Sequence, residues 1–314
     1  MLSDQLVSVI IPTLATRERG PFLERALTSV LYQEKLRTLP IVVSNGPACC
    51  PEVLNWLKKR SDIRYIHLEE ANLPRALSAG RELVDTHYFA ELDDDDILLP
   101  HALISRHESL SRSENIDAVV SNGFFHNNGK NVISHPNITA CQNDPLDSVL
   151  KYVWLNPGAA LFRTATIKAE MFAEMPQYLE WTYMALRLSL EKRVLFIDNP
   201  SFIHHLDLPF SIWRSETCIL NQPQALERIL ALDLPKTARA RYNKSWANAS
   251  HSVSRLYLKK VKYSSAWVWQ KKSLKKRFNL RHLPYIFSLL LRQSFFESSE
   301  QSSTFEQKKS ANVD

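Results

Sequence analysis

The N-terminal third of the chain alternates short β-branched apolar segments with amphipathic segments, and this alternation restricts the possible folds most strongly. Residues 6–11 have the sequence Leu-Val-Ser-Val-Ile-Ile, which is typical of a strand buried on both faces. The pattern predicts further strands at 39–43, 63–68 and 87–92, separated by helices at 21–33, 52–60 and 73–84. Such alternation favours a parallel sheet with right-handed crossovers. We therefore expect an α/β fold, Rossmann-like, with a mostly parallel sheet flanked by helices.

The middle of the chain continues with less regular elements. Strands are predicted at 117–121 and 194–197, and helices at 144–152, 166–172 and 180–191. Asn127-Asn128-Gly129 predicts a turn that joins two strands, and residues 156–163 are expected to be a loop running into a strand.

Charge separates the C-terminal part from the rest. Residues 236–292 hold 15 Lys and Arg and no Asp or Glu, whereas the remaining chain holds 24 basic and 33 acidic residues. We expect three parts: a first domain at 1–222, a basic helical extension at 223–296 and a disordered Ser/Gln-rich tail at 297–314.

The basic extension interleaves aromatic residues with cations, as in Trp267–Phe278. This mixture suits an interfacial helix on an anionic membrane surface. Two other interpretations stay open, a helical bundle packed on the first domain and a single-stranded nucleic-acid surface. Nucleic acid is the less favoured partner because no known nucleic-acid-binding module is visible.

Cysteine spacing and hydropathy favour a cytoplasmic protein. The four cysteines, Cys49, Cys50, Cys141 and Cys218, have no zinc-ligand spacing and predict free thiols. No stretch of about 18 apolar residues is present, and the N-terminus lacks the basic region of a signal peptide. We expect a cytoplasmic location, peripheral at the inner face of the plasma membrane if the extension binds lipid.

Four consecutive carboxylates, Asp93–Asp96, follow the strand predicted at 87–92, and an apolar segment comes directly after them. Ligands of parallel α/β sheets bind beyond the carboxyl ends of the strands. Adjacent carboxylates repel one another there by about 1–4 kcal/mol per pair, and a divalent cation with oxygen ligands removes this cost. The run therefore predicts a metal site, of Mn²⁺ or Mg²⁺, that also grips a diphosphate.

Three motifs together resemble family 2 glycosyltransferases of the GT-A fold. Val7–Thr13 resembles the first strand of that family with its Pro-Thr turn, Phe22–Gln33 resembles the following helix, and Leu92–Pro100 resembles its Asp-x-Asp-Asp motif. The resemblance covers about residues 5–215. It implies a GT-A domain at 1–222 and an inverting, hexosyltransferase-like enzyme.

The resemblance also implies roles for single residues. Asp93 would face the ribose of a nucleotide-sugar donor, Asp95 would bind the metal, and Asp96 would support the metal site or orient the acceptor. Pro12 and Thr13 would line the nucleotide pocket.

Two positions depart from the family pattern. Where the family has an acidic residue that contacts the base, this chain has Asn45, which both donates and accepts hydrogen bonds. The family's arginine in the next helix is absent in register. Arg75, two residues earlier, is either its replacement toward a phosphate or a surface arginine.

The base that removes the acceptor's proton should come from a later segment. The resemblance implies Glu180, at the start of a predicted helix. Either Glu180 replaces the family's catalytic Asp, or Trp181 occupies that position and the enzyme lacks a base. Glu180 also suits a helix N-terminus, and Trp181 either stacks on a sugar or is a rim aromatic.

Residues near 204–214 are the last candidates. The family often has a histidine there that completes the metal or diphosphate site, which implies His204 or its neighbour His205. Arg214 would meet the diphosphate.

The function expected from these features is metal-dependent, inverting sugar transfer from a nucleotide-sugar to a saccharide or lipid-linked acceptor. Cell-surface polysaccharide or lipopolysaccharide synthesis is the expected context. A non-catalytic nucleotide-sugar binder is the alternative if Trp181 holds the base position. A nucleotidyltransferase would need a Gly-rich triphosphate loop, of which Thr16–Gly20 is a faint match.

Overall fold

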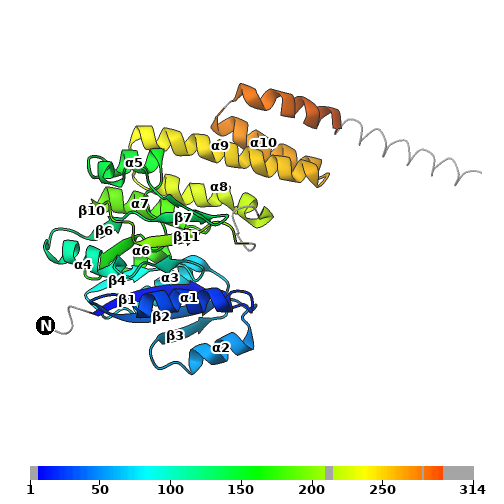
Figure 1. The fold of residues 1–314 in the computed structure, drawn as a ribbon. Helices are drawn as coiled ribbons and strands as arrows, with labels where there is room; N and C mark the ends of the chain where they lie inside the picture. Colours follow the sequence, from blue (N-terminus) through cyan, green and yellow to red (C-terminus); the bar gives the residue numbers. More distant parts are fainter. Residues whose placement is uncertain (1–5, 209–214, 278, 293–314) are drawn as a thin grey trace, which may run out of the picture. The chain divides into compact units, whose positions relative to one another are not determined.

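The computed structural model describes residues 6–208, 215–277 and 279–292 (Figure 1). The chain divides into two compact units, Met1–Trp213 and Arg214–Asp314, here called the N-terminal and C-terminal units. The boundary predicted after residue 222 falls inside helix α8 (Glu216–Ala231). The predicted disordered tail at 297–314 and the candidate Arg214 lie outside the described residues.

A seven-stranded sheet forms the core of the N-terminal unit. Its strands follow the order β10-β6-β9-β4-β1-β2-β3, and only β9 runs antiparallel to its neighbours. The strands are β1 (Leu6–Thr13), β2 (Arg37–Asn45), β3 (Arg64–Leu68), β4 (Tyr88–Glu91), β6 (Ala118–Ser121), β9 (Ala160–Arg163) and β10 (Val194–Ile197). The predicted mostly parallel α/β sheet is therefore confirmed.

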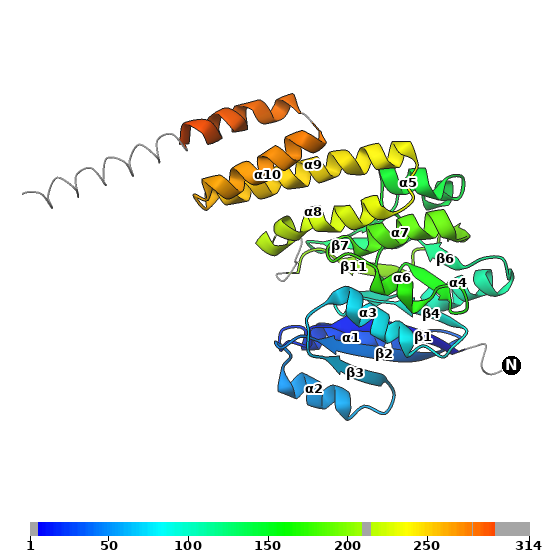
Figure 2. The same cartoon turned by 180° about the vertical axis from the view of Figure 1, so that it is seen from behind.

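Helices flank this sheet. They are α1 (Gly20–Leu31), α2 (Pro51–Lys58), α3 (Leu73–Glu82), α4 (Ala102–Ser111), α5 (Pro145–Lys151), α6 (Ala169–Ala173), α7 (Glu180–Glu191) and the 3₁₀ helix η2 (Ile138–Gln142). Figure 1 shows α1 in front of the sheet and Figure 2, from behind, shows α3 in front, so the two cover opposite faces. Gly80 lets α3 pack closely, because a Cβ there would lie 2.5 Å from Ile10 Cγ2.

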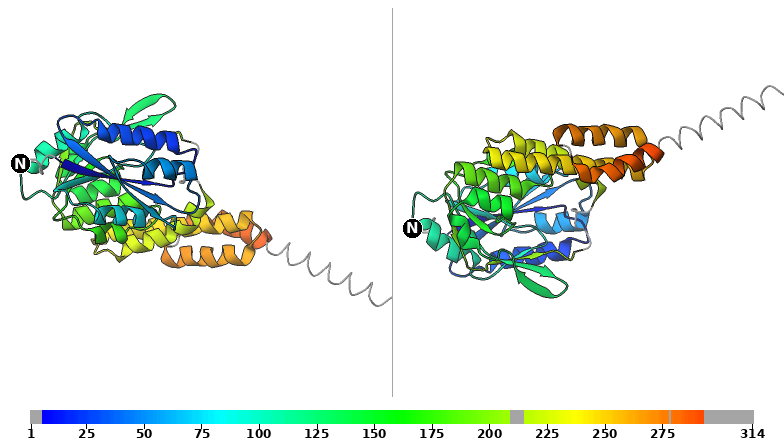
Figure 3. Two further views of the ribbon diagram at one scale, coloured as in Figure 1. Left: turned by 90° about the horizontal axis from the view of Figure 1, so that it is seen from below. Right: turned by 90° about the horizontal axis from the view of Figure 1, so that it is seen from above.

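A second, four-stranded sheet has the order β5-β11-β7-β8. Its strands are β5 (Ile97–Leu98), β7 (Phe124–Asn127), β8 (Lys130–Ile133) and β11 (Phe202–His205). The predicted turn is confirmed: Asn128 and Gly129 join β7 to β8 with φ of 49° and 76°, as a two-residue hairpin requires. All four residues of β8 are exposed, and Figure 3 shows the hairpin projecting from the N-terminal unit.

Strand register brings three strand ends together. Ile10 of β1 pairs with Glu91 of β4, and Thr13 at the end of β1 pairs with Ser44 near the end of β2. The backbone N–H of Leu92 still donates to the Ile10 carbonyl at 3.0 Å, so β4 delivers the acidic run beside the end of β1.

The C-terminal unit is helical, as predicted. Its described residues form α8, α9 (Lys236–Lys259), α10 (Tyr263–Lys276), η4 (Leu280–His282) and a helix at 283–292. Serine hydroxyls join α9 to α10: Ser254 donates to the Ala266 carbonyl at 2.6 Å, and Ser273 donates to the Ala247 carbonyl at 2.7 Å.

The cysteines and the helix lengths can be compared with the predictions drawn from composition. All four cysteines are free thiols, as expected. None of the helices in the described part of the chain combines the length and apolarity that crossing a bilayer requires.

Candidate functional site

The acidic run lies just beyond the carboxyl end of β4, in the turn before β5. Carboxylate oxygens of Asp93, Asp95 and Asp96 lie within 4.8 Å of one another. Asp96 is fully buried and the other two are half-buried. Three convergent oxygen donors at a strand end can hold a hard divalent cation.

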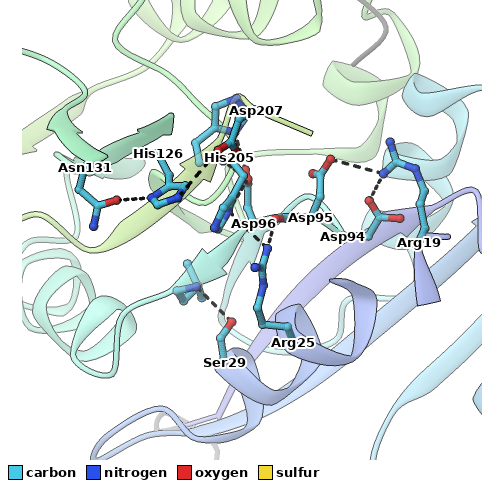
Figure 4. A network of polar contacts seen from close by, with 12 residues as sticks. Arg19, Arg25, Ser29, Asp94, Asp95, Asp96, His126, Asn131, His205 and Asp207 are labelled. Atoms are coloured by element: carbon cyan, nitrogen blue, oxygen red, sulfur yellow. Dashed lines mark hydrogen bonds and ion pairs between the residues drawn. The ribbon is translucent and has the colours of Figure 1, made fainter. Parts of the chain in front are cut away.

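Asp94 lies beside Arg19 (Figure 4) and joins the acidic run to β1 through Thr13. Its Oδ2 accepts from the Thr13 hydroxyl at 2.5 Å, and its Oδ1 pairs with Arg19. Arg19 Nη1 also lies 3.6 Å from Asp95 Oδ2. One arginine therefore offsets part of the negative charge of two neighbouring carboxylates.

Asp96 is held by two histidines of β11. His204 Nδ1 lies 2.5 Å from Asp96 Oδ2, and the backbone N–H of His205 donates to Asp96 Oδ1 at 2.9 Å. Both predicted histidines thus lie within a strand, and His204 reaches the acidic group through Asp96.

The pKa values reflect crowded negative charge. Burial and the neighbouring carboxylates raise the pKa of Asp93 well above its usual value, and the same causes raise the pKa of Asp95. Burial raises the pKa of Asp94 to about 7 against the opposing effect of Arg19. For Asp96, burial is outweighed by His204, so its pKa is lowered.

The pKa of His204 is shifted by the same group of carboxylates. Burial alone would lower its pKa, but the carboxylates of Asp96, Asp93 and Asp95 outweigh burial and raise it to about 9. Negative charge is therefore in excess at this site, and a divalent cation fits both the donor set and the charge.

The predicted nucleotide residues lie at adjoining strand ends. Pro12 and Thr13 end β1, and Asn45 ends β2. Each polar atom of the Asn45 side chain has one partner: its Nδ2 donates to the Thr13 carbonyl at 3.0 Å, and its Oδ1 accepts from the Asn72 backbone N–H at 3.0 Å. Asn45 thus ties β1 to the start of α3, and this cross-link occupies the polar atoms expected to read a base.

Arg75 lies in the first turn of α3. Its side chain is 63% exposed, and its Nη1 donates to Glu70 Oε2 at 3.0 Å. It is therefore a solvated arginine paired to a neighbouring loop, with no contact to the acidic run among the described interactions.

Glu180 is the first residue of α7 and is buried, at 8% exposure. Its Oε1 accepts from the backbone N–H of Tyr178 at 2.9 Å, and burial raises its pKa. Trp181 follows and is half-buried. Trp154, at 1% exposure, donates to the Pro145 carbonyl at 3.0 Å and belongs to the core, so it offers no stacking face to a sugar.

Two arginines of this site were not predicted from the sequence. Arg19 precedes α1, and Arg25 lies on α1, where its Nη2 donates to the Asp95 carbonyl at 2.7 Å and lies 3.4 Å from His205 Nδ1. The Nε of Arg25 is buried and finds no hydrogen-bond partner among the described residues. Their only sequence signal was basic charge on the segment that follows the first strand.

Two buried ionisable residues, Glu91 and Arg106, are linked through Gly158. Glu91 ends β4 and has a pKa raised well above normal by burial and by Asp93. Arg106 of α4 donates to the Gly158 carbonyl at 2.6 Å, and burial lowers its pKa to about 9. Gly158 also donates its N–H to the Glu91 carbonyl at 3.0 Å, with a φ of 74° that favours glycine.

Residues 8–168 match the model of the family described as glycosyl transferase family 2. The chain belongs to this family. The matched segment contains most of β1, the acidic run and Arg19, so the predicted family and enzyme class are confirmed at the level of the family.

Solved structures of S. aureus TarS have a similar fold. The 1–349 fragment with UDP-GlcNAc aligns with a TM-score of 0.56 at 15% identity, over 78% of this chain and 72% of that one. The same fragment with UDP aligns with a TM-score of 0.52 at 15% identity, over 91% and 79% of the two chains. This likeness supports the predicted GT-A fold.

A curated relative is an uncharacterized glycosyltransferase, RC0461, of Rickettsia conorii. It is 28% identical over 120 residues, which are 38% of this chain and 19% of the relative. The aligned part therefore spans about a fifth of that protein's length.

Proposed function

We propose that this chain transfers a sugar from a nucleotide-sugar donor to an acceptor hydroxyl with inversion, assisted by a divalent cation. The observation that carries the proposal is the convergence of Asp93, Asp95 and Asp96 oxygens within 4.8 Å beside the end of β1. Membership of glycosyl transferase family 2 supplies the reaction class.

Asp93 and Asp95 are the residues we expect to hold Mn²⁺ or Mg²⁺, with Asp96 in a supporting role. Both Asp96 oxygens already have partners on β11, whereas ionising Asp93 and Asp95 is opposed by their neighbours. When bound, the cation would offset the charge of the departing diphosphate. We propose that His204 holds Asp96 in place and adds positive charge beside the same site.

Glu180 is the proposed base. Its carboxylate would take the proton of the acceptor hydroxyl while the hydroxyl oxygen bonds to the anomeric carbon and the bond to the diphosphate breaks. Its raised pKa makes it a stronger proton acceptor than an exposed glutamate.

One observation favours a second candidate function. Glu180, in the first turn of α7, already accepts the backbone N–H of Tyr178, which lies two residues before the helix. A carboxylate with a purely structural role at a helix N-terminus would make such a bond. If Trp181 holds the base position instead, the protein would bind the donor without turnover.

For the donor, we propose a UDP-linked sugar as the first candidate, because the TarS structures with a similar fold contain UDP-GlcNAc and UDP. Pro12, Thr13 and Asp93 would line the nucleotide pocket. Three further residues are proposed to contact the donor: Asn45, Arg75 and Arg214. For this, Asn45 would have to give up its hydrogen bond with Asn72, and Arg75 its ion pair with Glu70.

For the acceptor, we propose a saccharide or lipid-linked saccharide of cell-surface polysaccharide or lipopolysaccharide. A position at the cytoplasmic face of the plasma membrane would bring the enzyme to such an acceptor.

The test is a thermal-shift screen of nucleotide-sugars with and without Mn²⁺, followed by donor hydrolysis with and without chelator. We expect one nucleotide-sugar to stabilise the protein only when metal is present. Asp95→Asn should abolish that shift and the turnover, and Asp85→Asn, an exposed aspartate on a distant loop, should change neither. Donor binding without hydrolysis or transfer by the unaltered chain would favour the second candidate function.

A further inference from the structure

The last described helix, residues 283–292, is attached to the C-terminal unit through one side. His282, just before it, stacks on His251 of α9 with ring centroids 3.8 Å apart and an interplanar angle of 7°. The Tyr285 hydroxyl lies 2.7 Å from Ser254 Oγ, also on α9, and Leu289 is fully buried. These contacts account for the docking of the helix and define its inner face.

The other side of this helix is apolar and exposed. Phe287 is 64% exposed, Leu290 47% and Leu291 60%, and Leu280 in the preceding turn is 68% exposed. Phe287 and Leu291 are four residues apart, so they lie on one face, and Leu290 borders it. The inner face docks the helix, and the exposure of these apolar side chains marks a surface for another partner.

The neighbouring helix α10 has a cationic outer face. Its buried residues, Ala266, Gln270 and Ser273, face the rest of the unit. Val268, Lys271 and Lys275 recur at i, i+3 and i+7 on the opposite face, and all three are exposed. The following residues Lys276 and Arg277 are exposed too. Figure 1 shows α10 in orange, followed by the last helix in a redder orange.

We propose that the outer faces of α10 and residues 283–292 form a docking surface for an anionic lipid bilayer. The apolar side chains would enter the boundary between headgroups and acyl chains, and the lysines would contact anionic headgroups. Charge complementarity selects this partner, because residues 236–292 contain 15 basic and no acidic residues. The surface shares no residue with the proposed transfer site, and the proposal does not depend on that site.

Two other partners fit the surface less well. A second copy of the chain would bring two lysine-rich faces together, and like charges repel. A single-stranded nucleic acid would meet the lysines and would stack a base on Phe287, but it would leave the aliphatic side chains of Leu290 and Leu291 in water. A bilayer with anionic lipids satisfies both the charge and the apolar side chains.

The experiment is cosedimentation of the full chain with vesicles of phosphatidylcholine alone and of phosphatidylcholine mixed with phosphatidylglycerol. We expect binding to the mixed vesicles that weakens as salt rises. Phe287→Ser/Leu291→Ser should reduce the partition coefficient on the order of tenfold or more, since two apolar side chains no longer enter the interface. Lys271→Gln/Lys275→Gln should reduce it by a similar factor.

Matched variants control for composition. Tyr32→Ser removes an aromatic side chain that is 77% exposed at the C-cap of α1, and Lys58→Gln/Lys59→Gln removes two exposed lysines at the end of α2. Both should leave the partition coefficient unchanged. Circular dichroism of each variant checks that the helices remain folded.

Three results would overturn the proposal. These are equal sedimentation with both kinds of vesicle, unchanged binding of the Phe287→Ser/Leu291→Ser variant, and a concentration-dependent dimer that this variant dissociates. Donor hydrolysis in the absence of vesicles should be the same for all variants, so loss of membrane binding is distinguished from loss of the transfer site.

Discussion

Replacing Asp95 by asparagine should stabilise the metal-free protein, although it should destroy the proposed metal site. The oxygens of Asp93 and Asp96 lie within 4.8 Å of Asp95, and unit charges at that distance repel by about 3.5 kcal/mol each at an effective dielectric constant near 20. The attraction between Arg19 Nη1 and Asp95 Oδ2, 3.6 Å apart, is favourable by about 4–5 kcal/mol by the same relation. These three pairs leave a balance of about 2 kcal/mol against ionised Asp95. Burial adds to this balance and His204 reduces it, and the pKa of Asp95 is raised overall.

Thermal unfolding in EDTA and in Mn²⁺ measures both effects. A gain of about 2 kcal/mol would raise the Tm of Asp95→Asn in EDTA by about 4–8 °C for a unit of this size. For the unaltered protein, metal at about 100 times its Kd should add about 2.7 kcal/mol, a rise of about 5–10 °C. Asp95→Asn should lose this second rise.

The control is Asp85→Asn, whose carboxylate is exposed and pairs with Arg64. It should gain no stability in EDTA and should keep the response to metal. The reasoning is refuted if Asp95→Asn lowers the Tm in EDTA, because Asp95 would then stabilise the fold. It is also refuted if the variant keeps the full Mn²⁺ response.

Two further predictions concern Glu180 and Arg19. Glu180→Gln should lower the transfer rate by roughly 10²- to 10⁴-fold while donor binding persists, and the rate of the unaltered enzyme should fall on the acid side as pH drops through the raised pKa of Glu180. Unchanged transfer by Glu180→Gln would remove it as the base. Arg19→Met leaves buried Asp94 without its cation and should cost about 3–5 kcal/mol in urea unfolding above neutral pH. The pKa of Asp94 is raised in the folded state to about 7, so the protonated carboxyl favours folding and the free energy of unfolding falls as pH rises through 7. At acid pH Asp94 is neutral and needs no cation, so the cost of Arg19→Met should shrink there. An equal cost at both pH values would contradict this account.

The spacing of apolar residues was sufficient to predict those strands and helices whose sequences are periodic over their own length. The segment 6–11 predicted β1 because its residues are apolar on both faces, and Glu180–Glu191 forms α7 over the predicted range. The antiparallel direction of β9 could not be predicted, because direction depends on partners far away in sequence. β5 and β11 also escaped prediction: β5 has two residues, and its strand structure arises only from pairing with β11.

Part of the site was predictable because the acidic run is contiguous. Its partners are distant: Arg19 contacts Asp94 across 75 residues, and His204 contacts Asp96 across 108. Charged residues at such separations have no periodic relation in sequence, so only the folded sheet pairs them. The same reason explains Asn45, whose amide is engaged by Thr13 and Asn72 in the folded chain.

The four aspartates divide into two kinds once their partners are known. Asp96 is ionised at no net cost, since His204 and the His205 N–H hold its carboxylate and lower its pKa. Asp93 and Asp95 have pKa values raised by burial and by their neighbours, so their charge is opposed in the folded protein. A cation binds most strongly to carboxylates whose negative charge is most unfavourable without it. We therefore expect Asp93 and Asp95 to contribute most of the free energy of metal binding. Removing the charge of Asp96 should instead release His204 and disturb β11, so the two kinds of aspartate differ in their effect on stability without metal.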